Sequence, residues 1–278
     1  MKREILIATD LDRTLIANGF HPESPKARPL FDQIVAKPGV RLAYVSGRDL
    51  NLIKDAMTVF ALPKPHYVVS DVGTAIWTWQ GNDWKRLKAW DDTISPGWNG
   101  RDAEEISHLL RGFHSIEKQE PTRQGQYKLS YYWYGQENLH RLSQRVAETL
   151  EAHGLRVHTI CSLDETTGEK FLDVLPKGAS KLGAVTFLMR LGAFSHERVV
   201  FSGDSGNDLD VLGSPIQSVL VANATDSVRN DAIALSQKNG CTDALYLAKG
   251  ACGMNGCYAA GILEGLAHFI PETTAWIE

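Results

Sequence analysis

The chain has 278 residues, enough for one large domain or two smaller ones, and its 43% hydrophobic and 22% charged residues are typical of a globular protein. A formal net charge of -4, without any cluster of lysines and arginines, excludes the basic surface that nucleic-acid binding requires. No apolar run approaches the roughly 20 residues of a membrane-spanning helix, and the four cysteines form no paired zinc pattern, so we expect a cytoplasmic protein with reduced thiols.

Short apolar runs alternate with helical patterns along most of the chain. The runs that predict strands are residues 5–9, 41–45, 67–70, 171–175, 199–202 and 218–221, and the helical patterns are residues 29–36, 50–60 and 180–191. Runs that are apolar throughout are typical of strands buried on both faces of a parallel sheet. The alternation predicts a doubly wound α/β core. Since the first strand begins so close to the N-terminus, we expect no signal peptide.

The middle of the chain, residues 80–169, differs from the rest in composition and in its hydrophobic pattern. It is rich in aromatic residues, and it has an alternating pattern at residues 127–134 and helical patterns at residues 103–113 and 137–153. Strands and helices without a motif at the strand ends predict an inserted α/β domain with an antiparallel sheet. We therefore expect a core made of residues 1–79 and 170–278 and an insert made of residues 80–169.

Four carboxylates follow two of the predicted strands. Asp10 and Asp12 come directly after the first strand, and Asp204 and Asp208 lie in the loop after residues 199–202. Asp10 and Asp12 point the same way because strand side chains alternate with a period of two. Like charges this close need a cation or a shifted pKa. The pattern indicates an oxygen-ligand site of the kind that Mg²⁺ prefers.

Two further strand ends carry polar motifs. Ser46, Gly47 and Arg48 follow the second strand, and Lys181 opens the helix after residues 171–175. Ligands of open parallel sheets gather at the carboxyl ends of the strands, so we expect these groups to meet the carboxylates. Phosphoryl transfer from a monoester needs a nucleophile, an acid, a cation and neutralising donors. The four strand ends together supply each of these.

The acids have distinct expected roles. Asp10 is the nucleophile that forms an aspartyl-phosphate, and Asp12 protonates the departing oxygen and then activates water. We expect acidic neighbours to raise the pKa of Asp12. The predicted Mg²⁺ ligands are Asp10, the backbone carbonyl of Asp12, and Asp204, while Asp208 holds a metal-bound water.

The remaining polar groups are expected to bind the phosphate. The Ser46 hydroxyl and the Gly47 amide donate to it, and Lys181 neutralises charge on the phosphate and on Asp10. Asn207, beside the metal acids, is expected to orient the phosphate or Lys181.

These motifs together resemble those of the haloacid dehalogenase superfamily of phosphohydrolases. Further segments resemble the sucrose-phosphate phosphatase family, namely residues 70–77, 128–132, 173–178, 221–224 and 259–269. The resemblance implies a Rossmann-like core, a C2-type cap between the second and third motifs, Mg²⁺ and a sugar-phosphate substrate. Arg13 departs from the family, which often has Asn there, and its side chain is expected not to touch the metal. The segment 252–257 is a second departure.

The cap is expected to select the sugar. By resemblance, the strand of Lys128 and Ser130 contributes to sugar recognition, and Asp71 and Gly73 at the hinge strand are expected to contact the sugar. The resemblance favours sucrose 6-phosphate as substrate. Glucosyl- or mannosyl-glycerate phosphate, another hexose phosphate, and phosphomutase activity are alternatives, whereas the complete set of acids argues against a non-catalytic sensor. A monomer is expected, and functional pairing with a glycosyl-phosphate synthase is left open.

Overall fold

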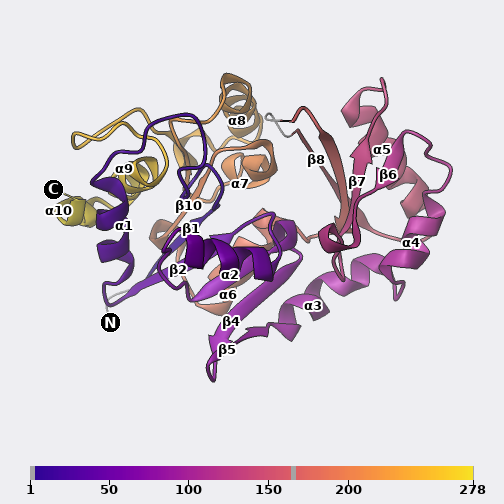
Figure 1. Ribbon diagram of the computed structural model, residues 1–278, viewed down its shortest axis with the longest axis horizontal. Helices are drawn as coiled ribbons and strands as arrows, with labels where there is room; N and C mark the ends of the chain where they lie inside the picture. Colours follow the sequence, from indigo (N-terminus) through magenta and orange to yellow (C-terminus); the bar gives the residue numbers. More distant parts are fainter. Residues whose placement is uncertain (1–3, 164–166, 278) are drawn as a thin grey trace.

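The computed structural model describes residues 4–163 and 167–277, which form two sheets (Figure 1). In spatial order, the strands of the larger sheet are β12 (Leu245–Leu247), β11 (Ser218–Leu220), β10 (Val199–Gly203), β1 (Ile5–Thr9), β2 (Val40–Val45), β3 (Tyr67–Ser70), β4 (Ala75–Gln80) and β5 (Asp83–Arg86). Neighbouring strands from β12 to β3 are parallel, and β4 and β5 extend the sheet as an antiparallel hairpin. The predicted α/β core is confirmed.

Helices cover both faces of this sheet. The helices of the core are α1 (Ala27–Val35), α2 (Leu50–Val59), α6 (Lys181–Leu191), α7 (Leu209–Leu212), α8 (Asp226–Lys238), α9 (Ala259–Phe269) and α10 (Thr274–Ile277). Ile5 and Ile7 of β1 pack in one apolar cluster with α1 and α9, while Leu6 and Ala8 pack in a second cluster with α6. Strand residues alternate between the faces, so a strand buried on both faces has to be apolar throughout.

The smaller sheet lies beside the core and is antiparallel (Figure 1). In spatial order its strands are β6 (Ile116–Lys118), β7 (Leu129–Trp133), β9 (Lys170–Pro176) and β8 (Val157–Leu163). Helix α3 (Lys88–Ile94) leads into this part of the chain, and α4 (Ala103–Leu109) and α5 (Leu139–Glu151) contribute Ile106 and Val146 to its apolar cluster. We call this part of the molecule the cap.

The predicted core strand at residues 171–175 is wrong in its placement. It lies within β9, which pairs antiparallel with β7 and β8 in the cap sheet. Its apolar run reflects burial on two sides, because Leu172 and Val174 pack in the cap cluster while Leu175 packs in the core cluster under α6. Burial on both faces gives the same sequence pattern in either sheet.

The strand pairing also bears on the limits of the insert. The hairpin of β4 and β5 extends the core sheet, although residues 80–86 were expected in the insert. We propose an insert that begins after β5 and includes β9. Within residues 4–163 and 167–277, no helix combines the length and the apolarity needed to cross a bilayer.

Candidate active site

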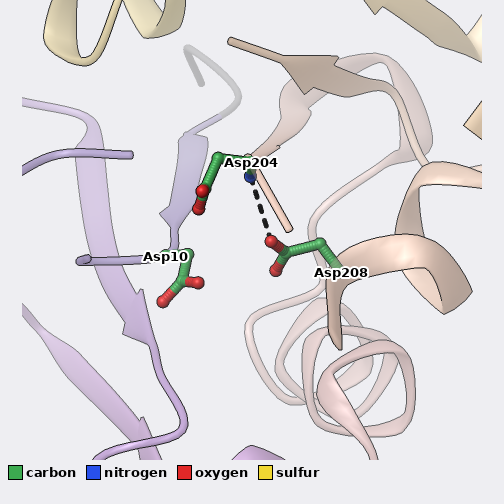
Figure 2. Close-up of side chains that lie close together, drawn as sticks. All are labelled: Asp10, Asp204 and Asp208. Atoms are coloured by element: carbon green, nitrogen blue, oxygen red, sulfur yellow. Dashed lines mark hydrogen bonds between the residues drawn. The ribbon is translucent and has the colours of Figure 1, made fainter. Parts of the chain in front are cut away.

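Three carboxylates meet at the carboxyl ends of β1 and β10. Asp10 directly follows β1, and its backbone N–H donates to the carbonyl of Ser202 in β10 at 2.9 Å. One carboxylate oxygen each of Asp10, Asp204 and Asp208 lies within 4.8 Å of the others, and Figure 2 shows the side chains gathered around one centre. The structure thus brings together three of the four acids that the sequence singled out.

Lys181 lies beneath this cluster with no exposed surface. Its Nζ donates to Asp10 Oδ2 at 2.9 Å, to Asp208 Oδ1 at 2.7 Å and to Asn207 Oδ1 at 2.7 Å. Burial acts to lower the pKa of Lys181, but Asp10 and Asp208 outweigh it and raise that pKa. An ammonium group has three N–H donors, so all of them are used and the lysine is fixed.

The loop after β10 holds Asp208 in place. Asp208 Oδ2 accepts hydrogen bonds from the backbone N–H groups of Asp204 and Ser205, both at 3.0 Å, and Figure 2 shows the first of these bonds. Gly203 makes this approach feasible, because a Cβ there would lie 2.4 Å from Asp208 Cγ. Asp208 therefore links the loop to Lys181.

The raised pKa values of Asp10 and Asp204 reflect burial and also repulsion between carboxylates that a cation would relieve. Burial raises the pKa of Asp10 to about 7, with Asp208 and Asp12 adding to the effect against the influence of Lys181. Burial, Asp208 and Asp10 likewise raise the pKa of Asp204. The donor set consists of oxygens, and a divalent cation would offset the repulsion, so these residues fit Mg²⁺.

Asp12 lies outside this triad and is held by different partners. Arg48 grips its carboxylate with two N–H groups, Nε to Oδ2 at 2.7 Å and Nη2 to Oδ1 at 2.6 Å, and Asn18 donates to Oδ1 at 2.8 Å. Burial acts to raise the pKa of Asp12, but Arg48 and Asn18 together hold it below its ordinary value. The expected upward shift of the Asp12 pKa is therefore wrong, because two charge-assisted hydrogen bonds from Arg48 stabilise the ionised carboxylate.

Three of the four expected phosphate-binding groups, Ser46, Gly47 and Asn207, line one cavity of about 460 Å³ with Asp10 and Asp12. The fourth, Lys181, is fully buried and is not among the lining residues. Ser46 Oγ accepts the backbone N–H of Arg48 at 3.2 Å, so the hydroxyl hydrogen is available to another acceptor. The cavity thus has donors close to Asp10.

The cap supplies the opposite wall of the same cavity. Lys128 just before β7, Ser130 of β7 and Asp173 of β9 line it, and Ser130 Oγ donates to Asp173 Oδ1. Asp173 was not assigned a role from the sequence, although its position opposite Ser130 in the register follows from strand pairing. Other cap residues in the wall that the sequence did not single out are Gln119, Arg123, Tyr132, Ser162, Leu163, Glu169 and Phe171.

Asp71 and Gly73 lie behind this wall, outside the set of residues that line the cavity. Asp71 Oδ1 is 3.5 Å from Lys128 Nζ, which joins the hinge to the cap. Gly73, with φ of 100°, packs on the backbone at Ser180, where a Cβ would lie 2.2 Å from the carbonyl carbon. This placement supports packing for Gly73 and an indirect role through Lys128 for Asp71.

Arg13 and Arg48 are the functional candidates that sequence reasoning undervalued. Arg48 belongs to the motif after β2, which was the available signal. Arg13 Nε lies 3.2 Å from Asp204 Oδ2, a contact that the sequence did not predict. The contact depends on the left-handed backbone of Arg13, with φ of 55°, which no motif reveals. That its side chain does not touch the metal stays a prediction.

Comparisons with known proteins agree with this geometry. A family model described as sucrose-6F-phosphate phosphohydrolase matches residues 3–270. A protein of Nitrosococcus oceani described as a HAD-like hydrolase is 44% identical over 279 residues, which span 100% of this chain and 75% of that protein. The glucosylglycerol-phosphate synthase of Pseudomonas anguilliseptica is 26% identical, over 95% of this chain but 31% of its own length.

A solved structure has the same overall arrangement. The sucrose-phosphatase of Synechocystis, in complex with sucrose and phosphate, matches with a TM-score of 0.76 at 25% identity, over 96% of this chain and 98% of that one. The family match spans nearly all of the chain, three of the four motifs line one cavity, and Lys181 of the remaining motif is bonded to Asp10 in its wall. The chain therefore belongs to the sucrose-6F-phosphate phosphohydrolase family and is a sugar-phosphate phosphatase with the haloacid dehalogenase fold.

Proposed function

We propose that the enzyme hydrolyses sucrose 6-phosphate to sucrose and phosphate, with Mg²⁺ as cofactor and Asp10 as nucleophile. The observation that carries this proposal is the cavity itself, which has Asp10 and the phosphate donors on the core side and polar cap side chains on the other. Its volume of about 460 Å³ lies within the range of roughly 300–1,000 Å³ for small-molecule sites.

The core residues have complementary tasks. An oxygen of Asp10 attacks phosphorus, the bond to the sugar oxygen breaks, and that oxygen takes a proton from Asp12. Asp12 then removes a proton from the water that hydrolyses the aspartyl-phosphate. Because Arg48 holds the pKa of Asp12 low, we infer that Asp12 takes up a proton from solvent water as substrate binds and passes that proton to the sugar oxygen.

Two kinds of positive charge support the transfer. Lys181 is bonded to Asp10, so it holds the nucleophile in place. Mg²⁺, held by Asp10, Asp204 and the Asp12 carbonyl and flanked by Asp208, would neutralise charge on the phosphoryl oxygens. The fixed positions of these groups reduce the reorganisation that the transition state requires.

Sucrose 6-phosphate is favoured by the family description and by the sucrose-phosphatase neighbour. The relationship to a glucosylglycerol-phosphate synthase keeps glycerol- and glycerate-linked glucosyl phosphates as the second candidates. The cap determines the choice, because the phosphate-binding motifs are common to all of these reactions.

The test is release of inorganic phosphate, in Mg²⁺, from a panel of substrates. The panel contains sucrose 6-phosphate, glucosylglycerol phosphate, glucosyl- and mannosyl-glycerate phosphates, and simple hexose phosphates. We expect kcat/KM for sucrose 6-phosphate to exceed the others about a hundredfold, or about 2.7 kcal/mol. A preference for another ester would overturn the substrate, and return of phosphate to the sugar would indicate a mutase.

A further inference from the structure

Arg13 places a positive charge directly on a candidate metal ligand. Its Nε lies 3.2 Å from Asp204 Oδ2, and the Arg13 side chain is 35% exposed whereas that of Asp204 is 4% exposed. The other oxygen of Asp204 accepts the hydroxyl of Thr14 at 2.9 Å. Both oxygens of this carboxylate therefore have partners within the protein.

The position of Arg13 is built by the fold. Its backbone is left-handed, with φ of 55°, which is uncommon for a residue other than glycine. The side chain of Asn18 accepts the Arg13 N–H at 2.8 Å, and the side chain of Asn223 donates to the Arg13 carbonyl at 2.7 Å. Asn223 is itself fixed by the backbone N–H of Tyr258 at 2.9 Å. Two asparagines thus direct Arg13 towards Asp204.

Charge balance gives this contact a consequence. When ionised, Asp10, Asp204 and Asp208 place three negative charges around one centre, and Lys181 cancels one of them. Arg13 cancels a second through Asp204. A cation that binds Asp204 has to compete with the guanidinium, so Arg13 weakens its binding.

Arg13 also lines the cavity that contains Ser46, Gly47 and Asn207. A guanidinium binds phosphate oxygens strongly, because its planar N–H groups match their geometry. A phosphate group in this cavity therefore offers Arg13 an alternative partner to Asp204.

We propose that Arg13 is an exchangeable counter-ion, which neutralises Asp204 in the metal-free protein and transfers to the phosphoryl group when substrate binds. The proposal rests on the proposed function of this site. Release of Asp204 by phosphate favours Mg²⁺, and by linkage Mg²⁺ favours phosphate to the same degree. Arg13 would thus keep the Mg²⁺ affinity low until a phosphate ester is bound.

The test is calorimetric titration of Mg²⁺ into metal-stripped protein, with and without inorganic phosphate. Without phosphate, we expect Arg13→Asn to bind Mg²⁺ about tenfold more tightly than the wild type, as removal of one nearby charge allows. Phosphate should strengthen Mg²⁺ binding less in Arg13→Asn than in the wild type. Arg13→Lys keeps the charge and should retain the weaker Mg²⁺ affinity.

Arg145→Asn is the matched control, because Arg145 is an exposed arginine paired with Glu137 in the cap. It changes net charge equally and should leave the Mg²⁺ affinity unchanged. If Arg13→Asn binds Mg²⁺ as tightly as the wild type or more weakly, the counter-ion role is overturned. If phosphate strengthens Mg²⁺ binding equally in Arg13→Asn and in the wild type, the transfer of Arg13 to phosphate is overturned. In both cases, Mg²⁺ binding by the wild type would leave the proposed function intact. Absence of Mg²⁺ binding in every variant, with and without phosphate, would overturn this inference and the proposed cofactor together.

Discussion

At the scale of single residues, buried charges that hold one another in place dominate the site. Lys181 has no exposed surface and contacts Asp10, Asp208 and Asn207. A buried charge without partners costs several kcal/mol, so removal of any one of these groups leaves a buried charge without one of its partners. The same bonds that stabilise the site therefore determine where the nucleophile lies.

Asp10→Asn should abolish phosphate release and leave the fold intact. An amide cannot form the acyl-phosphate, whereas its shape is close to that of the carboxylate and it can still accept a hydrogen bond from Lys181. Steady-state phosphate release and circular dichroism, measured on the same preparation, check both parts. Turnover close to that of the wild type would show that another residue attacks phosphorus.

Arg48→Gln should shift the pH profile of kcat/KM. Arg48 holds the pKa of Asp12 down, so its removal raises that pKa and keeps the acid protonated to higher pH. The alkaline limb, where Asp12 loses its proton, should therefore move to higher pH, along with a lower maximal rate. If the alkaline limb lies at the same pH in both proteins, the acid that titrates there is a group other than Asp12.

At the scale of elements, the turn between β3 and β4 carries unusual backbone strain. Asp71, Val72 and Gly73 have φ values of 54°, 59° and 100° in succession. For Asp71 and Val72 such conformations cost about 1–3 kcal/mol each and persist only where surrounding contacts enforce them, whereas glycine adopts positive φ freely. Here the N–H of Val72 donates to the carbonyl of Ser46 at 3.1 Å, so the turn supports the phosphate-binding loop.

Gly73→Ala should reduce both stability and turnover, because its Cβ would meet the backbone at Ser180, next to Lys181. Gly39→Ala is the control, since Gly39 has a similar φ of 86° with no atom within 4 Å of an added Cβ. The control should lose about 1–2 kcal/mol of unfolding free energy from its backbone alone. Gly73→Ala should lose a further 1–3 kcal/mol or so from crowding, measured by urea unfolding. Equal losses would contradict the packing role.

The limits of prediction from sequence are clearest at this scale. The strand-end motifs Asp10, Ser46 and Asp204 could be placed, because carboxyl ends of parallel strands share one edge. The sheet to which β9 belongs could not be predicted, because a strand buried on both faces has the same apolar pattern in a parallel core sheet and in a cap sheet. The Arg48 contact to Asp12 and the Arg13 contact to Asp204 depend on side-chain directions set by distant loops, as through Asn223.

At the scale of the whole molecule, the active site lies between two sheets with separate apolar clusters. The core side contributes Asp10, which Lys181 holds from behind, and the cap side contributes Lys128 and Asp173. The Lys128–Asp71 pair, with 3.5 Å between Nζ and Oδ1, ties the cap to the hinge. Binding at this boundary is expected to stabilise both parts together.

Mg²⁺ should raise the melting temperature of metal-stripped protein. A ligand at a hundred times its Kd that binds only the native state adds about 2.7 kcal/mol, which corresponds to several degrees for a chain of this size. Differential scanning fluorimetry, with NaCl at equal ionic strength as control, measures the shift. Asp204→Asn should lose most of it, and a wild-type protein insensitive to Mg²⁺ would exclude binding at the carboxylate cluster.

Strand β9 places Asp173 in the cavity wall and then runs through Pro176 towards the helix that begins at Lys181. One short stretch of chain therefore carries a candidate sugar contact and the lysine that holds the nucleophile. We expect substitutions that shift the backbone of β9 to affect Lys181 as well, because it follows five residues after the end of that strand, whereas β7 is not followed along the chain by a catalytic group. Laboratory or natural selection for a new sugar should accordingly accept substitutions more readily in β7 than in β9.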